Sequence, residues 1–235
     1  MMKKTRRNIK KYWYGVVGAM VVLLGGVAHA HAETEFMTNW QTRTYVPAWY
    51  EGRAFPTHES AITITFELIE DGKIADLSQT GVRWYVDGKL VKNELNGLGI
   101  KRVIIVNKKY GGGVSSIKIT IPSYNGKLYE KTFDIPIRKP EVVIDVPYFK
   151  KGIERGENAM YAWPFFFNTT DVRTLNLQWT IDGKALDTKK ADEAALLFTV
   201  GSDIPPGSRS TIEAIIINQR KAIENVRNKV FVEMP

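Results

Sequence analysis

Two six-residue stretches decide the fold: Trp84-Tyr85-Val86-Asp87-Gly88-Lys89 and, 95 residues later, Trp179-Thr180-Ile181-Asp182-Gly183-Lys184. In each stretch, residues expected to point inward alternate with residues expected to point outward, which is the period of a half-buried strand. The Asp-Gly pair that follows suits the positive backbone dihedrals of a tight hairpin. A shared hairpin at this spacing indicates a duplicated domain, because solenoid repeats have periods of about 20 to 50 residues. We therefore expect Trp84 and Trp179 to be structural core residues of two equivalent domains.

The residues around these hairpins carry further strand signals. From Ala61 to Leu68, apolar and polar residues alternate with period two, which predicts a half-buried strand. For residues 192–197 the sequence is compatible with one helical turn or with the beginning of a strand. Short strands separated by Gly, Asn and Pro turns predict an all-β chain of two tandem antiparallel β-sandwiches. The other predicted strands cover 103–106, 117–121, 133–137, 141–146, 161–167, 195–200, 211–217 and 229–232.

The domain boundaries follow from these strands and from the turn residues between them. Residues 33–60 are predicted to be an aromatic-rich lead-in and first strand, and residues 61–138 the first sandwich, which includes part of 40–60. Residues 139–235 are predicted to be the second sandwich. The boundary falls at Ile137-Arg138-Lys139-Pro140, where a proline precedes the next strand. Such a short linker restricts the relative orientations of two domains.

A tryptophan strand followed by an Asp-Gly hairpin, in a domain of about 95 residues, resembles the bacterial immunoglobulin-like and PKD-like modules of envelope and surface proteins. The order of a signal, the stretch Thr44-Tyr45-Val46-Pro47-Ala48-Trp49-Tyr50-Glu51-Gly52-Arg53 and two such domains is similar to a family of exported proteins from minimal-genome bacterial lineages. The resemblance implies immunoglobulin-like sandwiches. It implies no site residues, and the chain has neither the inter-sheet cysteines of antibody domains nor the Gly-Asp-Gly turn of PKD modules.

The first 32 residues have the layout of an export signal. Six basic residues precede an uncharged stretch from Tyr12 to Ala32. Its most apolar part, 14–28, is shorter than the roughly 20 residues that span a bilayer. We expect a signal peptide cleaved before His31 or Glu33, and the alternative is an uncleaved N-terminal membrane anchor helix. Arg6-Arg7 leaves export by the general or the twin-arginine route open.

Charge and cysteine content exclude several kinds of partner. The chain has 33 basic and 25 acidic residues, and without the six basic residues of the head 27 basic residues remain, a net charge of +2. Because no sustained basic run remains, we expect no nucleic-acid partner. Membrane contact is expected only through residues 1–32, if they stay uncleaved. The chain has no cysteine, which excludes a disulfide framework, a thiolate metal site and a lipoprotein anchor.

The sequence also offers little for catalysis. After cleavage at the second site only His58 remains as a proton shuttle, and it lies in a turn where we expect it to be exposed. No Gly-x-Ser-x-Gly elbow, calcium loop or phosphate-binding loop occurs. We therefore predict no catalytic, metal-binding or cofactor-binding residues, and no enzyme. A carboxylate-based hydrolase is the least favoured of the alternatives considered.

Two aromatic clusters are the main candidates for function. The first precedes the strand at Ala61 and contains the candidate partner-binding residues Trp40, Tyr45, Trp49, Tyr50 and Phe55. The second contains Tyr161, Trp163, Phe165, Phe166 and Phe167. We expect Tyr161, Trp163, Phe165 and Phe167 to alternate into the core of the second sandwich. Exposed aromatic side chains anchor protein partners or stack on sugar rings.

These observations predict a non-catalytic binding or structural module outside the cytoplasm, either secreted, periplasmic or at the cell surface. We expect it to work through protein–protein contacts with an envelope or surface protein. The alternative is a carbohydrate-binding module that contacts a polysaccharide with exposed aromatic residues.

Overall fold

The computed structural model describes residues 34–146, 153–186, 189–190 and 194–234. Antiparallel strands form the regular structure of these residues, together with two short 3-10 helices, η1 (Glu94–Asn96) and η3 (Val172–Thr174). No helix in this part of the chain is long and apolar enough to cross a membrane. The signal peptide or anchor expected over residues 1–32 lies outside the described residues. The described chain is therefore all-β.

The chain has two compact units, and a β-hairpin forms the main described part of the smaller unit. In this hairpin Ile69, near the end of β2 (Ala61–Glu70), pairs with Ile74 of β3 (Lys73–Ile74). Asp71 and Gly72 make the turn with φ values of 52° and 72°, a backbone conformation that Asp tolerates and Gly adopts freely. The smaller unit comprises Met1–Glu35 and Leu68–Ala75, and the larger one comprises Phe36–Glu67 and Asp76–Pro235.

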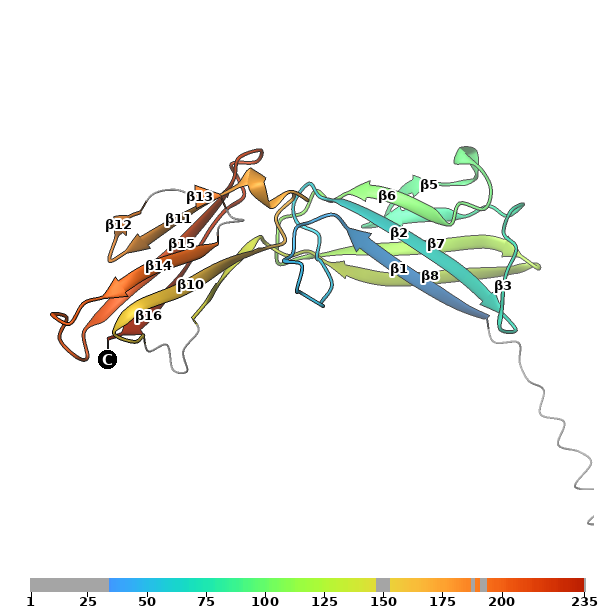
Figure 1. The fold of residues 1–235 in the computed structure, drawn as a ribbon. Helices are drawn as coiled ribbons and strands as arrows, with labels where there is room; N and C mark the ends of the chain where they lie inside the picture. The colour runs from blue at the N-terminus through green and yellow to red at the C-terminus, as the bar shows by residue number, and fades with distance from the viewer. Residues whose placement is uncertain (1–33, 147–152, 187–188, 191–193, 235) are drawn as a thin grey trace, which may run out of the picture. The chain divides into compact units, whose positions relative to one another are not determined.

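Two antiparallel sheets form from the strands between residues 34 and 136. The first has the order β1-β2-β3, with β6 also paired to β2, and the second has the order β5-β4-β7-β8 (Figure 1). The strands are β1 (Thr34–Thr42), β2 (Ala61–Glu70), β3 (Lys73–Ile74), β4 (Arg83–Val86), β5 (Lys89–Lys92), β6 (Arg102–Val106), β7 (Val114–Tyr124) and β8 (Lys127–Pro136).

The period-two pattern of β2 buries one face of that strand. Ile62, Ile64 and Phe66 are at most 2% exposed, because successive side chains of a strand point to opposite faces. The Phe66 ring lies 5.5 Å from the ring of Trp84 on β4, which belongs to the other sheet. Trp84 is 0% exposed, and its indole N–H donates to the carbonyl oxygen of Ile100 at 2.8 Å. These contacts pack the two sheets as a sandwich.

Two more antiparallel sheets form from the strands after residue 140. One has the order β14-β10-β9, and the other has the order β12-β11-β15-β16 with β13 also paired to β11. The strands are β9 (Glu141–Asp145), β10 (Gly156–Phe165), β11 (Leu175–Ile181), β12 (Lys184–Ala185), β13 (Lys189–Lys190), β14 (Ala195–Val200), β15 (Arg209–Asn218) and β16 (Asn225–Glu233). Of the two structures left open for residues 192–197, the strand is present from Ala195.

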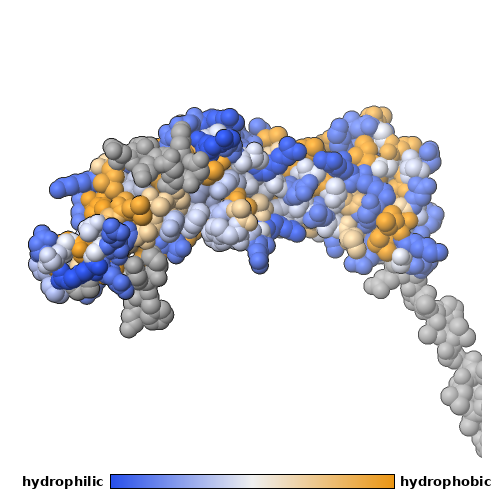
Figure 2. Space-filling model, in the orientation of Figure 1, coloured by the Kyte–Doolittle hydropathy of each residue, from blue (hydrophilic) through white to orange (hydrophobic). Residues whose placement is uncertain are grey.

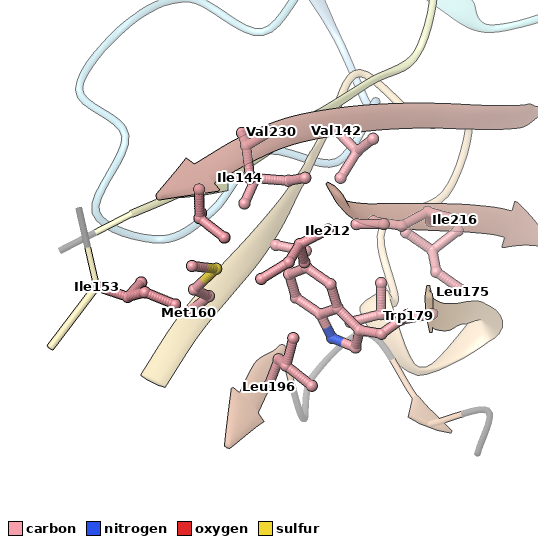
Figure 3. Close-up of a cluster of buried hydrophobic side chains, with 14 of the residues drawn as sticks. Val142, Ile144, Ile153, Met160, Leu175, Trp179, Leu196, Ile212, Ile216 and Val230 are labelled. Atoms are coloured by element: carbon pink, nitrogen blue, oxygen red, sulfur yellow. The ribbon is translucent and has the colours of Figure 1, made fainter. Parts of the chain in front are cut away.

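Trp179 lies within the apolar core between these two sheets (Figure 3). The core combines Val142 and Met160 from the three-stranded sheet with Ile212 and Val230 from the sheet that carries Trp179. Trp179 is 1% exposed, and its indole nitrogen has no hydrogen-bond acceptor among the described residues. The second pair of sheets is therefore also a sandwich.

The two halves share a strand order. In the first half β4, which carries Trp84, lies between the short strand β5 and the long strand β7. In the second half β11, which carries Trp179, lies between the short strand β12 and the long strand β15. Each long strand then pairs with the next strand along the chain, β8 or β16. Antiparallel sheets in this repeated order are consistent with tandem immunoglobulin-like sandwiches.

Candidate binding surface

Trp40 lies on β1, and its ring contacts other residues of the segment that follows. The guanidinium carbon of Arg53 is 4.6 Å from the centre of the Trp40 ring, and the Phe55 ring is 6.0 Å away. The Thr44 hydroxyl donates to the carbonyl oxygen of Phe55 at 2.7 Å. These contacts close residues 43–57 into a loop.

Tyr45 joins this loop to the end of β10. Its backbone N–H donates to the carbonyl oxygen of Phe167 at 2.8 Å, and its own carbonyl oxygen accepts the N–H of Phe166 at 2.7 Å. The three residues belong to the same compact unit. The Tyr45 side chain also packs against the core that contains Trp179. Tyr45 is therefore engaged within the chain.

Tyr50 and Phe55 contact phenylalanines at the end of β10 and directly after it. The Tyr50 ring lies 5.2 Å from Phe165 and 6.5 Å from Phe166, and the Phe55 ring lies 5.5 Å from Phe166. All three contacts are edge-on, the geometry that aromatic quadrupoles favour. Tyr50 and Phe55 are half-buried. Their rings contribute mainly to packing between residues 43–57 and 165–166.

Trp49 is the most exposed of the five candidate residues, at 55%. The edge of its ring contacts Trp163 at 5.5 Å and Phe165 at 6.0 Å. The backbone N–H of Tyr50 donates to the carbonyl oxygen of Pro47 at 2.9 Å, which forms a turn that holds Trp49 at its tip. Trp49 is thus oriented by the chain and still accessible.

The expectation that Tyr161 and Trp163 alternate into the second core is wrong. On β10 the inward residues are Met160 and Ala162, both 0% exposed, whereas Tyr161 is 38% exposed and Trp163 is half-buried. Phe166 has a φ of 61°, a conformation rare for bulky residues. Phe165, Phe166 and Phe167 are all buried, because Trp49 and Tyr50 contact Phe165 on the outward face and the alternation is interrupted at Phe166. The aromatic residues recur at every second position, but the buried face of the strand changes within this run, so their spacing does not predict which of them are buried.

The outward residues of β10 form an aromatic pair. The rings of Tyr161 and Trp163 are stacked with centres 5.7 Å apart and planes within 10°. On the neighbouring strands, Val143 lies opposite Trp163 and Leu197 lies opposite Ala159. Val143 is 43% exposed and Leu197 is 72% exposed. We call Trp49, Val143, Tyr161, Trp163 and Leu197 the β10 face.

Hydrophobic residues gather over β10 and β14, in the left half of the space-filling view (Figure 2). Sequence reasoning missed this surface because the aromatic residues were assigned to the opposite phase. Met160, Ala162 and Pro164 also recur at every second position, and this pattern was the signal in the sequence that could have indicated the buried face of the strand. An exposed apolar group on a sheet face is a candidate interaction site.

His58 is half-buried, contrary to the expectation that it is exposed. Its ring stacks on Tyr110 with centres 4.2 Å apart. A cavity of about 180 Å³ beside this stack is also lined by Lys139 and Glu224. The buried Glu224 carboxylate accepts the backbone N–H of Asn168 at 3.0 Å and the Asn218 side-chain amide at 2.8 Å. Within the described ranges, no group of three or more His, Cys, Asp or Glu residues is arranged to hold a metal ion.

No model of a known protein family matches the sequence, and no curated protein matches it. The chain is similar to the three N-terminal domains of the bacteriophage RB49 Highly Immunogenic Outer Capsid protein (Hoc), with 10% identity, 86% of this chain and 59% of that chain covered, and a TM-score of 0.45. It is also similar to the fibronectin(III)-like modules of Clostridium thermocellum CbhA, with 12% identity, 84% and 93% coverage, and a TM-score of 0.28. For SGBP-B from the Bacteroides ovatus mixed-linkage glucan utilization locus, the identity is 13%, the coverage 84% and 47%, and the TM-score 0.24. The chain thus spans less than two thirds of the Hoc and SGBP-B structures, and the fold assignment depends on the strand order described above.

Proposed function

We propose that this chain is a non-catalytic binding module that works outside the cytoplasm and contacts an envelope or surface protein through the β10 face. The basic head and apolar stretch of residues 1–32 support the compartment. The stacked pair Tyr161 and Trp163, on an outward sheet face, is the observation that carries the proposed activity. We propose 61–138 and 139–235 as the two sandwiches, with the partner contact in the second.

The physical argument concerns aromatic surface area. Burying a large ring in an interface stabilises it by about 25 cal/mol per Å² of apolar area, and an aromatic ring loses few rotamers. The Tyr161–Trp163 stack, the edge contact of Trp49 and the flanking strands already restrict these side chains. A partner would therefore meet a preorganised surface, which lowers the entropic cost of binding.

A polysaccharide is the second candidate, because the planes of Tyr161 and Trp163 are parallel within 10°. A sugar ring needs an open aromatic face. In this pair the two rings stack on each other with an offset, their centres 5.7 Å apart, and Trp49 also contacts Trp163 edge-on. A stacked pair of this kind leaves less ring area for a sugar than a flat platform would, which favours a protein partner.

The test is photo-crosslinking in the producing cells. A photoreactive amino acid replaces Leu197 in the otherwise unchanged chain, and the matched control carries it at Leu128, which is 62% exposed in the other sandwich. We expect a discrete protein adduct from position 197 that is absent from position 128. The adduct should disappear when Tyr161→Ala and Trp163→Ala are added and the melting temperature is unchanged. An adduct that survives this double substitution would contradict the proposal.

Binding of soluble glycans, monitored by tryptophan fluorescence, separates the two candidates. Saturable quenching by a glycan that is lost in the Tyr161→Ala/Trp163→Ala variant, without any protein adduct, would favour the carbohydrate-binding function.

A further inference from the structure

On the outward side of the sheet β14-β10-β9, all charged side chains are acidic. Asp145 lies opposite Tyr161 and Glu141 lies opposite Phe165 on the paired strands, and Glu157 precedes Tyr161 by two outward positions. All three carboxylates are exposed. The outward positions of β9, β10 and β14 include no Lys or Arg. The β10 face is therefore an aromatic surface flanked by negative charge on β9 and at the beginning of β10.

These three carboxylates have no cationic partner in the described part of the chain. None of the ion pairs formed by described residues involves Glu141, Asp145 or Glu157. Arg155, the nearest basic residue before β10, donates to the carbonyl oxygens of Gly201 and Ser202. No ion pair formed by the described residues therefore involves the carboxylates of this face.

The first sandwich contains the same kind of arrangement with its cation in place. Tyr85 on β4 lies beside Lys118 on β7, and the Lys118 ammonium is 5.9 Å from the centre of the Tyr85 ring. The same ammonium pairs with the Glu130 carboxylate on β8 at 2.9 Å. An aromatic ring, a cation and a carboxylate therefore meet on neighbouring strands. Tyr161 and Asp145 place a ring and a carboxylate at paired positions of neighbouring strands, and no cation–π contact or ion pair among the described residues involves either of them.

We infer that the partner of the β10 face presents Lys or Arg side chains to Tyr161, Trp163 and Asp145. This inference rests on the proposed function and specifies the chemistry of the partner, a basic protein segment. A guanidinium or ammonium group over an aromatic ring gains a cation–π interaction, and Asp145 pairs with the same group because directly opposed Cβ atoms are only about 5 Å apart. The same carboxylates repel anionic membranes and nucleic acids.

The charge test uses three carboxylate substitutions, Glu141→Gln, Asp145→Asn and Glu157→Gln, in one variant. The matched control, Glu35→Gln, Asp134→Asn and Asp203→Asn, removes the same number of exposed charges elsewhere. The probes are hexa-arginine and hexa-glutamate peptides with blocked termini, titrated into isotope-labelled protein and followed by NMR. Circular dichroism melts confirm that each variant is folded.

We expect hexa-arginine to shift the Trp163 indole N–H and amides of β9, β10 and β14, and hexa-glutamate to leave them unchanged. The substitutions on the face should weaken hexa-arginine binding by about tenfold, as expected for the loss of several exposed charge pairs. The control variant should bind as the parent does. Shifts elsewhere only, equal shifts with hexa-glutamate, or equal weakening in the control would overturn the inference.

Crosslinking from position 197 separates this inference from the proposed function. If the adduct persists in the carboxylate variant and is lost in the aromatic variant, the β10 face binds a partner and the inference about its charge is wrong. If the adduct persists in both variants, the proposed function itself fails. Loss in both variants, with the control variant unaffected, supports the proposed function and the inference together.

Discussion

The Oδ1 atom of Asp182 accepts a hydrogen bond from the backbone N–H of Thr211 at 2.8 Å, and the N–H of Asp182 donates to the carbonyl oxygen of Thr211 at 2.9 Å. Asp87 makes the same two contacts with Ser116, at 3.0 Å and 2.8 Å. The partners are 29 residues apart in both halves. The aspartate of each repeated hairpin therefore makes the turn and also ties it to the neighbouring long strand.

Replacing Asp182 with Ala should lower the free energy of unfolding by about 1–2 kcal/mol, because a hydrogen bond is lost and Ala is forced into a left-handed conformation. Asp182 has a φ of 49°. Asp182→Asn is the matched control, since Asn retains an acceptor and tolerates this conformation. Urea denaturation measures both variants. Equal losses for Ala and Asn would contradict the role given to the side-chain oxygen.

The sequence predicted the sandwich strands well where period-two burial is strict. On β2 each inward residue is apolar, so the pattern is readable without tertiary information. On β1 the half-buried positions are Thr34, Phe36, Thr38, Trp40 and Thr42, and the threonines obscure the alternation. A first strand was predicted within the aromatic-rich lead-in of residues 33–60, but its bounds were not.

The candidate site was less predictable, because it depends on a conformation that composition does not reveal. Residues 160–167 are apolar on both phases of the strand, so spacing alone does not say which phase is buried. The left-handed Phe166 and the bridge from Tyr45 to Phe167 decide this. Both depend on contacts between residues more than 100 positions apart.

The two core tryptophans should respond differently to replacement by Phe. Trp84 donates its indole N–H to the carbonyl oxygen of Ile100, whereas the Trp179 nitrogen has no acceptor among the described residues. We expect Trp84→Phe to cost about 1 kcal/mol more than Trp179→Phe, the net value of one hydrogen bond. Denaturant titrations of the two variants provide the measurement, and a larger loss for Trp179→Phe would contradict this assignment.

Glu94 should make stability depend on pH in the acid range. Hydrogen bonds from Arg83 lower the pKa of Glu94 from 4.5 to about 2. A carboxyl group with a lowered pKa in the folded state stabilises the protein above its unfolded pKa, and this contribution is lost as the pH falls from about 4.5 towards 2. Glu94→Gln should therefore lower the melting temperature at pH 7 and converge with the parent protein near pH 2. A constant difference across this range would contradict the prediction, and added salt should reduce the difference at pH 7 because the pair is exposed.

Glu224 should be a stabilising residue, because the residue is 4% exposed and its carboxylate accepts hydrogen bonds from Asn168 and Asn218. Glu224→Ala leaves the N–H of Asn168 and the amide of Asn218 without this acceptor, and we expect a loss of about 2–3 kcal/mol. Glu224→Gln retains one oxygen acceptor and should lose less. Thermal melts at pH 7 distinguish the two variants, and an Ala variant as stable as the parent would mean that water replaces the carboxylate at no cost.

Tyr50 and Trp49 are adjacent in sequence, and single substitutions separate packing from exposure. Tyr50→Ala removes two ring contacts from a half-buried side chain, so we expect a loss of about 2–3 kcal/mol in the free energy of unfolding. Trp49→Ala removes a side chain that is 55% exposed and should cost only about 1 kcal/mol, the value of its edge contacts. Leu95→Ala, at a residue that is 89% exposed, is the control and should change the melt little.

The same Trp49→Ala variant also tests the β10 face, because it removes the edge-on contact between Trp49 and Trp163. If Trp49 only shields Trp163, the adduct from position 197 should persist after its removal. If the partner contacts Trp49 directly, the adduct should weaken while the melting temperature changes little. A Tyr50→Ala variant with an unchanged melt would contradict the packing role of Tyr50, because a ring that contributes nothing to folding cannot be held between Phe165 and Phe166. The residues 43–57 would then be free to meet a partner themselves.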